Sequence, residues 1–311
     1  MLTEMIALIA KRILAAFFTV LAVLMLAGVL VHAVPGDPVT AMMASSASMT
    51  PDAVNEMRDR LGLDQPIWRQ VGDYVLNALT GDLGTSFRAN EPVALLILER
   101  LPNTLLLSVA GLGLAAMIGV PVGVAAAVNR GNGVDTFLTT IMVLAFSVPG
   151  FWLGLILMQI FALRLRWLPV AGTDLENMVL PALTLGLAYS PIVARMTRSA
   201  LLDVLAEDFV RTARARGLPE SQVLAVHVLR PALVNIVTIL GIGFASMMGG
   251  QVIIESVFAW NGLGRLAVQA MLQRDYPVIQ GFVVAFATSI VVISTCLELL
   301  YALLDPRMRR L

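Results

Sequence analysis

The sequence predicts an all-α integral membrane protein with six transmembrane helices. Only 14% of its 311 residues are charged and 58% are hydrophobic, whereas a soluble domain carries about 25% charged residues. Six runs also lack Asp, Glu, Lys and Arg over a length that can span a bilayer, for which about 20 residues suffice. These runs are Ile13–Gly36, Leu105–Val128, Thr136–Leu163, Asn177–Ala194, Pro231–Ile254 and Tyr276–Leu297.

The first run allows two interpretations. Lys11 and Arg12 precede it, and Val31-His32-Ala33 resembles a signal-peptide cleavage site. The apolar core of a signal peptide has about 7 to 15 residues, however, and the run Ile13–Gly36 is longer. We therefore expect a retained first span rather than a cleaved leader.

The only long outer segment, Asp37–Arg100, predicts two short helices outside the membrane. Thr50-Pro51 is typical of a helix start, and Gly62 is typical of its end. Pro66 opens a second helix that we expect to end at Gly81. The apolar residues expected on one face of this second helix are Ile67, Val71, Tyr74, Val75, Ala78 and Leu79.

Several spans contain residues that interrupt helices. A proline inside a span, such as Pro121, removes a backbone hydrogen bond, and lipid tolerates this only where protein or water supplies a substitute. In the fifth span, Gly241, Ala245 and Gly249 form a stripe of small residues typical of close helix packing. The helix breaks that we expect to line a passage are Pro149, Gly150, Pro181, Pro191, Gly249 and Gly250.

The stretch Arg195–Pro231 carries six arginines between two apolar runs and predicts two helices with a break. The first helix continues from the fourth span and stops at Gly217, a residue that tolerates left-handed geometry. The second helix starts at Pro219 and ends near Arg230, because Pro231 disfavours helical geometry in the residue before it. Ala213 and Gly217 are four residues apart, so we expect them on one face, forming a groove that a partner's backbone can approach.

The basic residues predict the orientation of the chain. With both termini in the cytoplasm, twelve of the 21 Lys and Arg residues lie on the inner side, including all six arginines of Arg195–Pro231. Five of the nine outer ones fall in the long segment Asp37–Arg100, where the positive-inside rule has little force. We therefore expect the arginine-rich stretch to be cytoplasmic.

The sequence lacks the motifs of the common enzyme classes. No GxxxxGK[ST] phosphate loop, HExxH or GxSxG occurs, and His32 and His227 fall on opposite sides of the membrane in the predicted topology. Cys296 is the single cysteine, so no disulfide framework or metal spacing is present. We therefore expect no enzymatic activity and no cofactor bound by this chain.

The segment EDFVRTARARGLPESQVLAVHVLRPAL (207–233) resembles the cytoplasmic coupling loop of ABC importer permeases, in particular the dipeptide, oligopeptide and nickel permease family. Ala213, Gly217 and Leu229 match the loop pattern of the wider superfamily, and Arg211-Thr212-Ala213 replaces its opening Glu-Ala-Ala. Nearly the whole chain shares the resemblance. The other matching segments are Pro35–Pro38, Leu61–Pro66, Gly81–Gly84, Ala194–Arg198, Gly262–Arg265 and Arg274–Pro277.

The resemblance implies a type I importer permease fold in a bacterial cytoplasmic membrane. It divides the chain into an N-terminal segment with the first span (1–36), a periplasmic helical segment (37–100) and a permease core (101–311) that contains the coupling loop 195–231. The coupling residues it implies are Glu207, Asp208, Arg211, Thr212, Ala213, Arg214, Gly217 and Leu229.

The resemblance also implies partners and cargo. Two cytoplasmic ATPases would bind ATP and Mg²⁺, a second permease would complete the pore as a heterodimer or a homodimer, and a solute-binding protein would dock on Asp37–Arg100 and Phe258–Tyr276. We expect short peptides as cargo, with nickel complexes, glutathione or another small solute as alternatives.

Two other classes are alternatives to this reading. An ion-coupled secondary transporter would carry intramembrane carboxylates and an internal repeat, and the sequence shows neither. A membrane-tethered nucleic-acid binder could use Arg211–Gln222 as a basic helix-turn-helix, but the net charge of the chain is zero.

Overall fold

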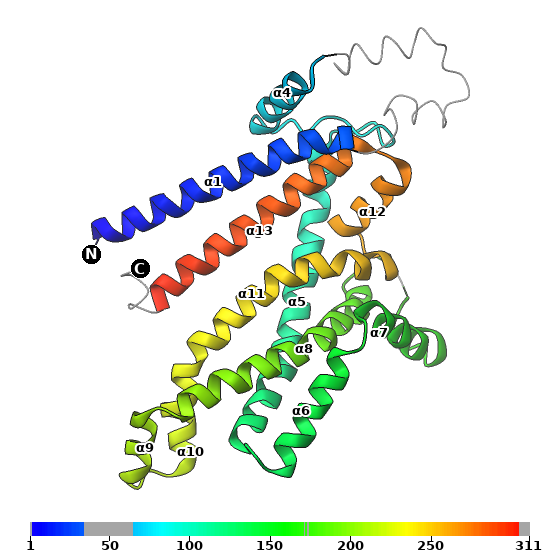
Figure 1. The fold of residues 1–311 in the computed structure, drawn as a ribbon. Helices are drawn as coiled ribbons and strands as arrows, with labels where there is room; N and C mark the ends of the chain where they lie inside the picture. Colours follow the sequence, from blue (N-terminus) through cyan, green and yellow to red (C-terminus); the bar gives the residue numbers. More distant parts are fainter. Residues whose placement is uncertain (1, 34–64, 171, 173, 305–311) are drawn as a thin grey trace. The chain divides into compact units, whose positions relative to one another are not determined.

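The computed structural model describes residues 2–33, 65–170, 172 and 174–304, and these are almost entirely helical (Figure 1). The helix expected from Thr50 to Gly62 lies outside the described residues. Among the described helices, five are long and apolar enough to cross a membrane, or six when one bent pair counts as a single span. The predicted fold class is confirmed.

Two compact units make up the chain, Met1–Asn103 with Gly262–Thr295 and Thr104–Asn261 with Cys296–Leu311. The first unit contains α1 (Leu2–Ala33), α4 (Ile67–Leu79), the start of α5 (Val93–Val128), α12 (Leu263–Gln273) and most of α13 (Tyr276–Leu304). α1 and α13 run side by side (Figure 1), and the side-chain amide of Gln280 donates to the carbonyl of Ala27 at 3.0 Å.

The prediction for α4 is confirmed in its bounds and is partly wrong in its apolar face. Val71, Tyr74, Val75 and Ala78 pack in a cluster that also includes Leu24 and Val284. Ile67 and Leu79 remain 53% exposed, since they lie at the two ends of the short helix. Gly81 ends the segment with φ +90°, in the left-handed region.

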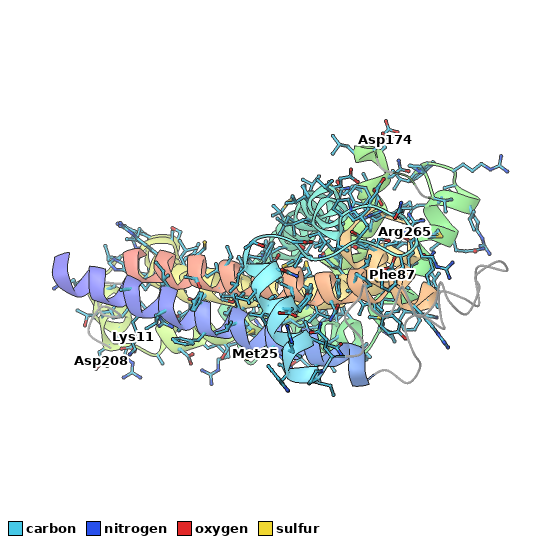
Figure 2. The ribbon with its side chains drawn as sticks, turned by 90° about the horizontal axis from the view of Figure 1, so that it is seen from above. Lys11, Met25, Phe87, Asp174, Asp208 and Arg265 are labelled. Carbon is cyan, nitrogen blue, oxygen red and sulfur yellow. The ribbon has the colours of Figure 1, made fainter. Side chains whose placement is uncertain are left out.

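The second unit is built around α8 (Leu175–Leu205). Its other elements are α5 from Thr104 onward, α6 (Gly133–Phe146), α7 (Gly150–Leu157) with the π-helical turn η1 (Met158–Arg164), α9 (Asp208–Ala215), α10 (Glu220–Gln222), the π-helical turn η2 (Val223–Leu229) and α11 (Arg230–Val257). α8 packs against α6, α7 and α11. It is about 46 Å long at 1.5 Å per residue, and Figure 2 shows Asp174 and Asp208 beyond its opposite ends.

The third predicted span is not one straight helix. α6 ends at Phe146, α7 begins at Gly150, and the two are bent by 92°. Pro149 precedes the new helix, lacks a backbone donor and disfavours helical geometry in Val148. The break predicted at Pro149-Gly150 is therefore confirmed.

The prolines of α8 do not interrupt it. Pro181 and Pro191 lie inside the continuous helix, so the breaks expected there are wrong. Pro191 cannot donate to the carbonyl of Leu187, and the hydroxyl of Ser190 donates to that carbonyl instead at 3.1 Å. α5 likewise continues through Pro121.

Glycines of α5 allow a close approach between α5 and α8. A Cβ on Gly119 would stand 2.7 Å from the carbonyl oxygen of Ser190, and one on Gly123 would collide with the carbonyl oxygen of Ala194. These glycines are four residues apart, which places them on the same helix face. The expected contact at Gly249 is wrong, since a Cβ there meets nothing within 4 Å.

Candidate functional site

The segment between α8 and α11 forms one end of the second unit. α8 continues past Arg195 and Arg198 as predicted, but it ends at Leu205, and Glu207 starts the separate helix α9. The first predicted helix therefore consists of two. Gly217 follows α9 with φ +77°, which confirms the left-handed position expected there.

The second predicted helix does not end at Arg230. α10, η2 and α11 form one continuous helical segment from Glu220 to Val257, and Pro231 lies in the first turn of α11. The preceding turn, η2, is π-helical, which shifts the hydrogen-bond register where the proline lacks a donor. The expected helix end is wrong because this wider turn accommodates the ring.

α9 is fixed to the rest of the unit by its apolar underside. Val210 is fully buried and Ala213 is 5% exposed, and both belong to a cluster with Val223, Val228 and Ala232. The prediction that Ala213 and Gly217 share a helix face open to a partner is wrong. α9 ends at Ala215, before Gly217, and Ala213 packs against its own chain. Ala213 thus lets α9 lie close to η2, and Leu229 packs against the same cluster.

The polar residues of α9 divide into two sets. Arg214 donates from Nε and Nη2 to the Glu220 carboxylate at 3.1 and 2.7 Å, closing the loop around Gly217. This hydrogen bond raises the pKa of Arg214 above its ordinary value. Thr212 donates to the carbonyl of Asp208 at 2.9 Å, within its own helix.

The second set faces outward. Glu207, Asp208 and Arg211 are exposed, and the nearest charged atoms of Arg211 and Asp208 are 3.7 Å apart in an exposed pair that contributes little to stability. The outward surface of α9 therefore carries charges of both signs, while the opposite face of the helix is packed against the rest of the unit. Such a surface can form directional contacts with another protein.

The six residues expected to line a passage differ in their burial. Pro181 and Pro191 are buried within α8, whereas Pro149 is exposed at the bend before α7. Gly150 lies 3.6 Å from Ala188 at its Cβ position, and Gly250 lies 2.9 Å from the hydroxyl of Tyr189. Gly249 is exposed on α11. Their lining of a passage stays a prediction.

Sequence reasoning missed a buried polar network between α5 and α11. The hydroxyl of Thr104 donates to Oε1 of Glu255 at 2.8 Å, and the hydroxyl of Ser108 donates to Oε1 of Gln251 at 2.8 Å. All four side chains are almost fully buried. The spacing was the one indication of this network in the sequence. Thr104 and Ser108 are four residues apart on α5, and Gln251 and Glu255 are four residues apart on α11.

A carboxylate also links the two segments expected to face a solute-binding protein. Asp275, at the start of α13, accepts from the hydroxyl of Ser86 at 2.5 Å and from the backbone amides of Phe87 and Arg88 at 3.2 and 3.3 Å. The loop before α5 and the α12–α13 corner are therefore held together.

Metal ligands are not grouped in the described part of the chain, where no three His, Cys, Asp or Glu side chains are placed to hold an ion. His227 is half-buried in η2.

Long apolar helices around α8, joined at one end by a short charged helix, define a multi-pass membrane permease. Residues 119–310 match the family described as "Binding-protein-dependent transport system inner membrane component", and residues 5–108 match its N-terminal counterpart. The chain belongs to this family of ABC importer inner-membrane components, in its peptide/nickel-type branch.

Curated relatives agree over the full length. The chain is 41% identical over 300 residues to "Glutathione transport system permease protein GsiC" of Salmonella typhimurium, which covers 96% of this chain and 97% of the relative. It is 40% identical to the protein of the same name from Escherichia coli K12, with the same coverage. It is therefore a permease subunit of a bacterial ABC importer in the inner membrane, and proteins of this kind are not themselves enzymes.

Solved structures show the same fold. A chain of the inward-facing MetNI methionine ABC transporter superposes with a TM-score of 0.61 at 19% identity, covering 68% of this chain and 96% of that one. The type I importer permease fold expected from the sequence is thereby confirmed.

Proposed function

We propose that this permease forms half of the passage through which an ATP-driven importer takes up short peptides delivered by a solute-binding protein. The main support for the proposal is the way α9 packs against the rest of the second unit. Its buried underside fixes it to η2 and α8, while Glu207, Asp208 and Arg211 face outward. A force applied to that surface is passed directly to the helices α8 and α11.

We infer the partner subunits from this packing of α9 and from the family of the chain. Two ATPase subunits on the cytoplasmic side hold ATP and Mg²⁺ and grip α9, and this chain binds no cofactor itself. A second, similar permease completes the passage as a heterodimer, with a homodimer as the alternative. The termini and α9 are cytoplasmic, in agreement with the arginines of Arg195–Pro231.

The outer side receives the solute-binding protein. Asp275 ties the loop at Ser86 to the corner that precedes α13, so these parts of the two docking segments are held together. The description of the family supports this partner.

The cargo is a short peptide. The names of the relatives favour glutathione within this class, and nickel complexes or another small solute remain alternatives. An ion-coupled secondary transporter is the remote alternative, and it would transport without nucleotide.

The test is uptake by proteoliposomes containing the assembled permeases and ATPases together with the binding protein. We expect uptake of radiolabelled Ala-Ala-Ala and glutathione only when ATP is hydrolysed. Arg211→Glu reverses a charge on the outward surface of α9 and should lower uptake by about tenfold, the effect of losing ~1.4 kcal/mol of interaction. Arg130→Glu, on an exposed arginine outside this surface, is the matched control. Uptake without nucleotide, or an Arg211→Glu variant that transports normally, would contradict the proposal.

A further inference from the structure

A groove opens between the inner halves of α8 and α11. The two helices lie side by side in Figure 1, and the groove has a volume of about 580 Å³. That volume is within the range of roughly 300 to 1,000 Å³ typical of small-molecule sites. Its lining residues are Arg195, Met196, Ser199, Ala200 and Asp203 from α8, and Asn235, Thr238, Ile239 and Ile242 from α11.

The α8 wall has a cation at one end and an anion at the other. Arg195, Ser199 and Asp203 follow one another at four-residue spacing, so they lie in one row along the helix. The rise from Arg195 to Asp203 is about 12 Å. Ser199 lies between the charges, and Asn235 supplies a second neutral hydrogen-bonding group from α11.

Both charges are available. Arg198, one turn after Arg195, is engaged by Asp135 through two 2.8 Å bonds. Within the described part of the chain, Arg195 and Asp203 form no ion pair. Arg195 stacks over the ring of Phe146 at 5.7 Å, a contact that orients the guanidinium and leaves its charge in place.

Lipid is a poor occupant for such a surface. Arg195 and Asp203 follow the predicted span Asn177–Ala194, so we place this charged wall at the cytoplasmic end of α8, beyond the hydrocarbon. The wall between the charges mixes Ser199 and Asn235 with the apolar side chains of Ile239 and Ile242. This lining suits a molecule with charged ends and a variable middle.

The geometry points to a binding site for the carried peptide in its zwitterionic form, with its carboxylate at Arg195 and its ammonium group at Asp203. This inference rests on the proposed function and adds a site on the inner part of the passage. An extended tripeptide spans about 10 to 11 Å, close to the rise of about 12 Å between these two positions of α8, whereas a dipeptide spans only about 7 Å. Arginine binds a carboxylate through two parallel hydrogen bonds, which fixes the direction of the peptide.

Recognition of both ends requires no particular side chain on the cargo. A peptide held only by its termini is selected by length and by free ends, since the apolar part of the groove contacts its middle without hydrogen-bond readout. The site therefore discriminates capped peptides from free ones, and this is the property to measure.

The experiment uses the assembled permease–ATPase complex in nanodiscs, with the solute-binding protein left out because it binds peptide itself. The dissociation constants of Ala-Ala-Ala, Ala-Ala-Ala-amide and N-acetyl-Ala-Ala-Ala are measured by equilibrium dialysis. In the unmodified complex, each capped peptide should bind about tenfold more weakly than the free one, as expected for the loss of one charge-assisted bond. Arg195→Gln should abolish only the discrimination against the amide, and Asp203→Asn only that against the acetylated peptide.

Arg130→Gln is the matched control, because it removes an exposed inner arginine outside the groove. The assembled state of every variant is checked by size-exclusion chromatography. The double exchange Arg195→Asp with Asp203→Arg serves as a further variant, because it keeps the net charge of the groove. Equal binding of free and capped peptides, or variants with unchanged discrimination, would overturn the binding site. The proposed function would still stand in that case if the complex took up Ala-Ala-Ala with ATP hydrolysis. A transporter that takes up no peptide in that assay fails the proposed function, and the site falls with it.

Discussion

Arg198 donates from Nε and Nη2 to the two carboxylate oxygens of Asp135, each bond being 2.8 Å long. This bidentate pair joins the start of α6 to the C-terminal half of α8. Asp135 also accepts from the backbone amide of Gly131 at 3.0 Å and from the hydroxyl of Thr139 at 3.3 Å. The carboxylate therefore holds the turn between α5 and α6 as well as the arginine.

Asp135→Asn should lower the melting temperature of the assembled complex, because a neutral amide cannot accept both guanidinium bonds. The measurement is the fraction of intact complex on size-exclusion chromatography after heating. Asp174→Asn, at an exposed position before α8, should leave the melting temperature unchanged. Exchanging the charges in Asp135→Arg with Arg198→Asp should recover part of the loss, and no recovery would show that the pair does not act as a unit.

Gly123→Ala should separate α5 from α8. The added Cβ would collide with the carbonyl oxygen of Ala194 and stand 2.7 Å from the Cβ of Thr197, so one helix must shift. Such overpacking costs about 1 to 3 kcal/mol. Gly113→Ala is the control on the same helix, since its Cβ meets nothing within 4 Å, and there alanine gains roughly 0.5 to 1 kcal/mol over glycine. Equal melting temperatures for the two variants would contradict the close packing.

The sequence was sufficient for features that depend on local chemistry. Charge-free runs identified the long helices, Pro66 and Gly81 marked the limits of α4, and Gly217 was recognised as a left-handed position. In each case the cause lies within a few residues of the effect. Hydrophobicity and turn preference were enough to predict these elements.

Features that depend on a neighbouring element were missed. Pro191 was expected to break α8, but Ser190 supplies the replacement donor within the packed helix. Ala213 was assigned to a partner's groove, and its burial against Val223 is decided by how α9 folds back on η2. The Gly119–Gly123 pair was not singled out, because its significance depends on α8 lying across it.

Gly217→Val should uncouple transport from ATP hydrolysis. Left-handed geometry costs a residue with a Cβ about 1 to 2 kcal/mol, and the φ of +77° at Gly217 sets the path from α9 to α10. Gly131→Val carries the same strain at φ +80° in a turn outside the α9 loop, and neither glycine has an atom within 4 Å of its Cβ position. We expect the number of ATP molecules hydrolysed per peptide imported to rise for Gly217→Val alone. Gly217→Asn, which tolerates this geometry, should stay close to the unmodified protein.

The buried network between α5 and α11 gives a last prediction. Thr104→Val keeps the shape of the side chain but removes the hydroxyl that donates to Glu255, and Ser108→Ala removes the donor to Gln251. A buried polar group that loses a partner costs about 1 to 3 kcal/mol. Each variant should therefore lower the melting temperature of the complex.

Ser256→Ala is the control. It removes only the hydrogen bond from the Ser256 hydroxyl to the carbonyl of Val252 in the same helix, and it should change the melting temperature much less. Ser108 Oγ also lies 2.8 Å from the backbone carbonyl of Thr104, one turn earlier on the same helix, so the two substitutions affect neighbouring groups and should not be additive. Fully additive losses would show that the two hydrogen-bonded pairs act independently.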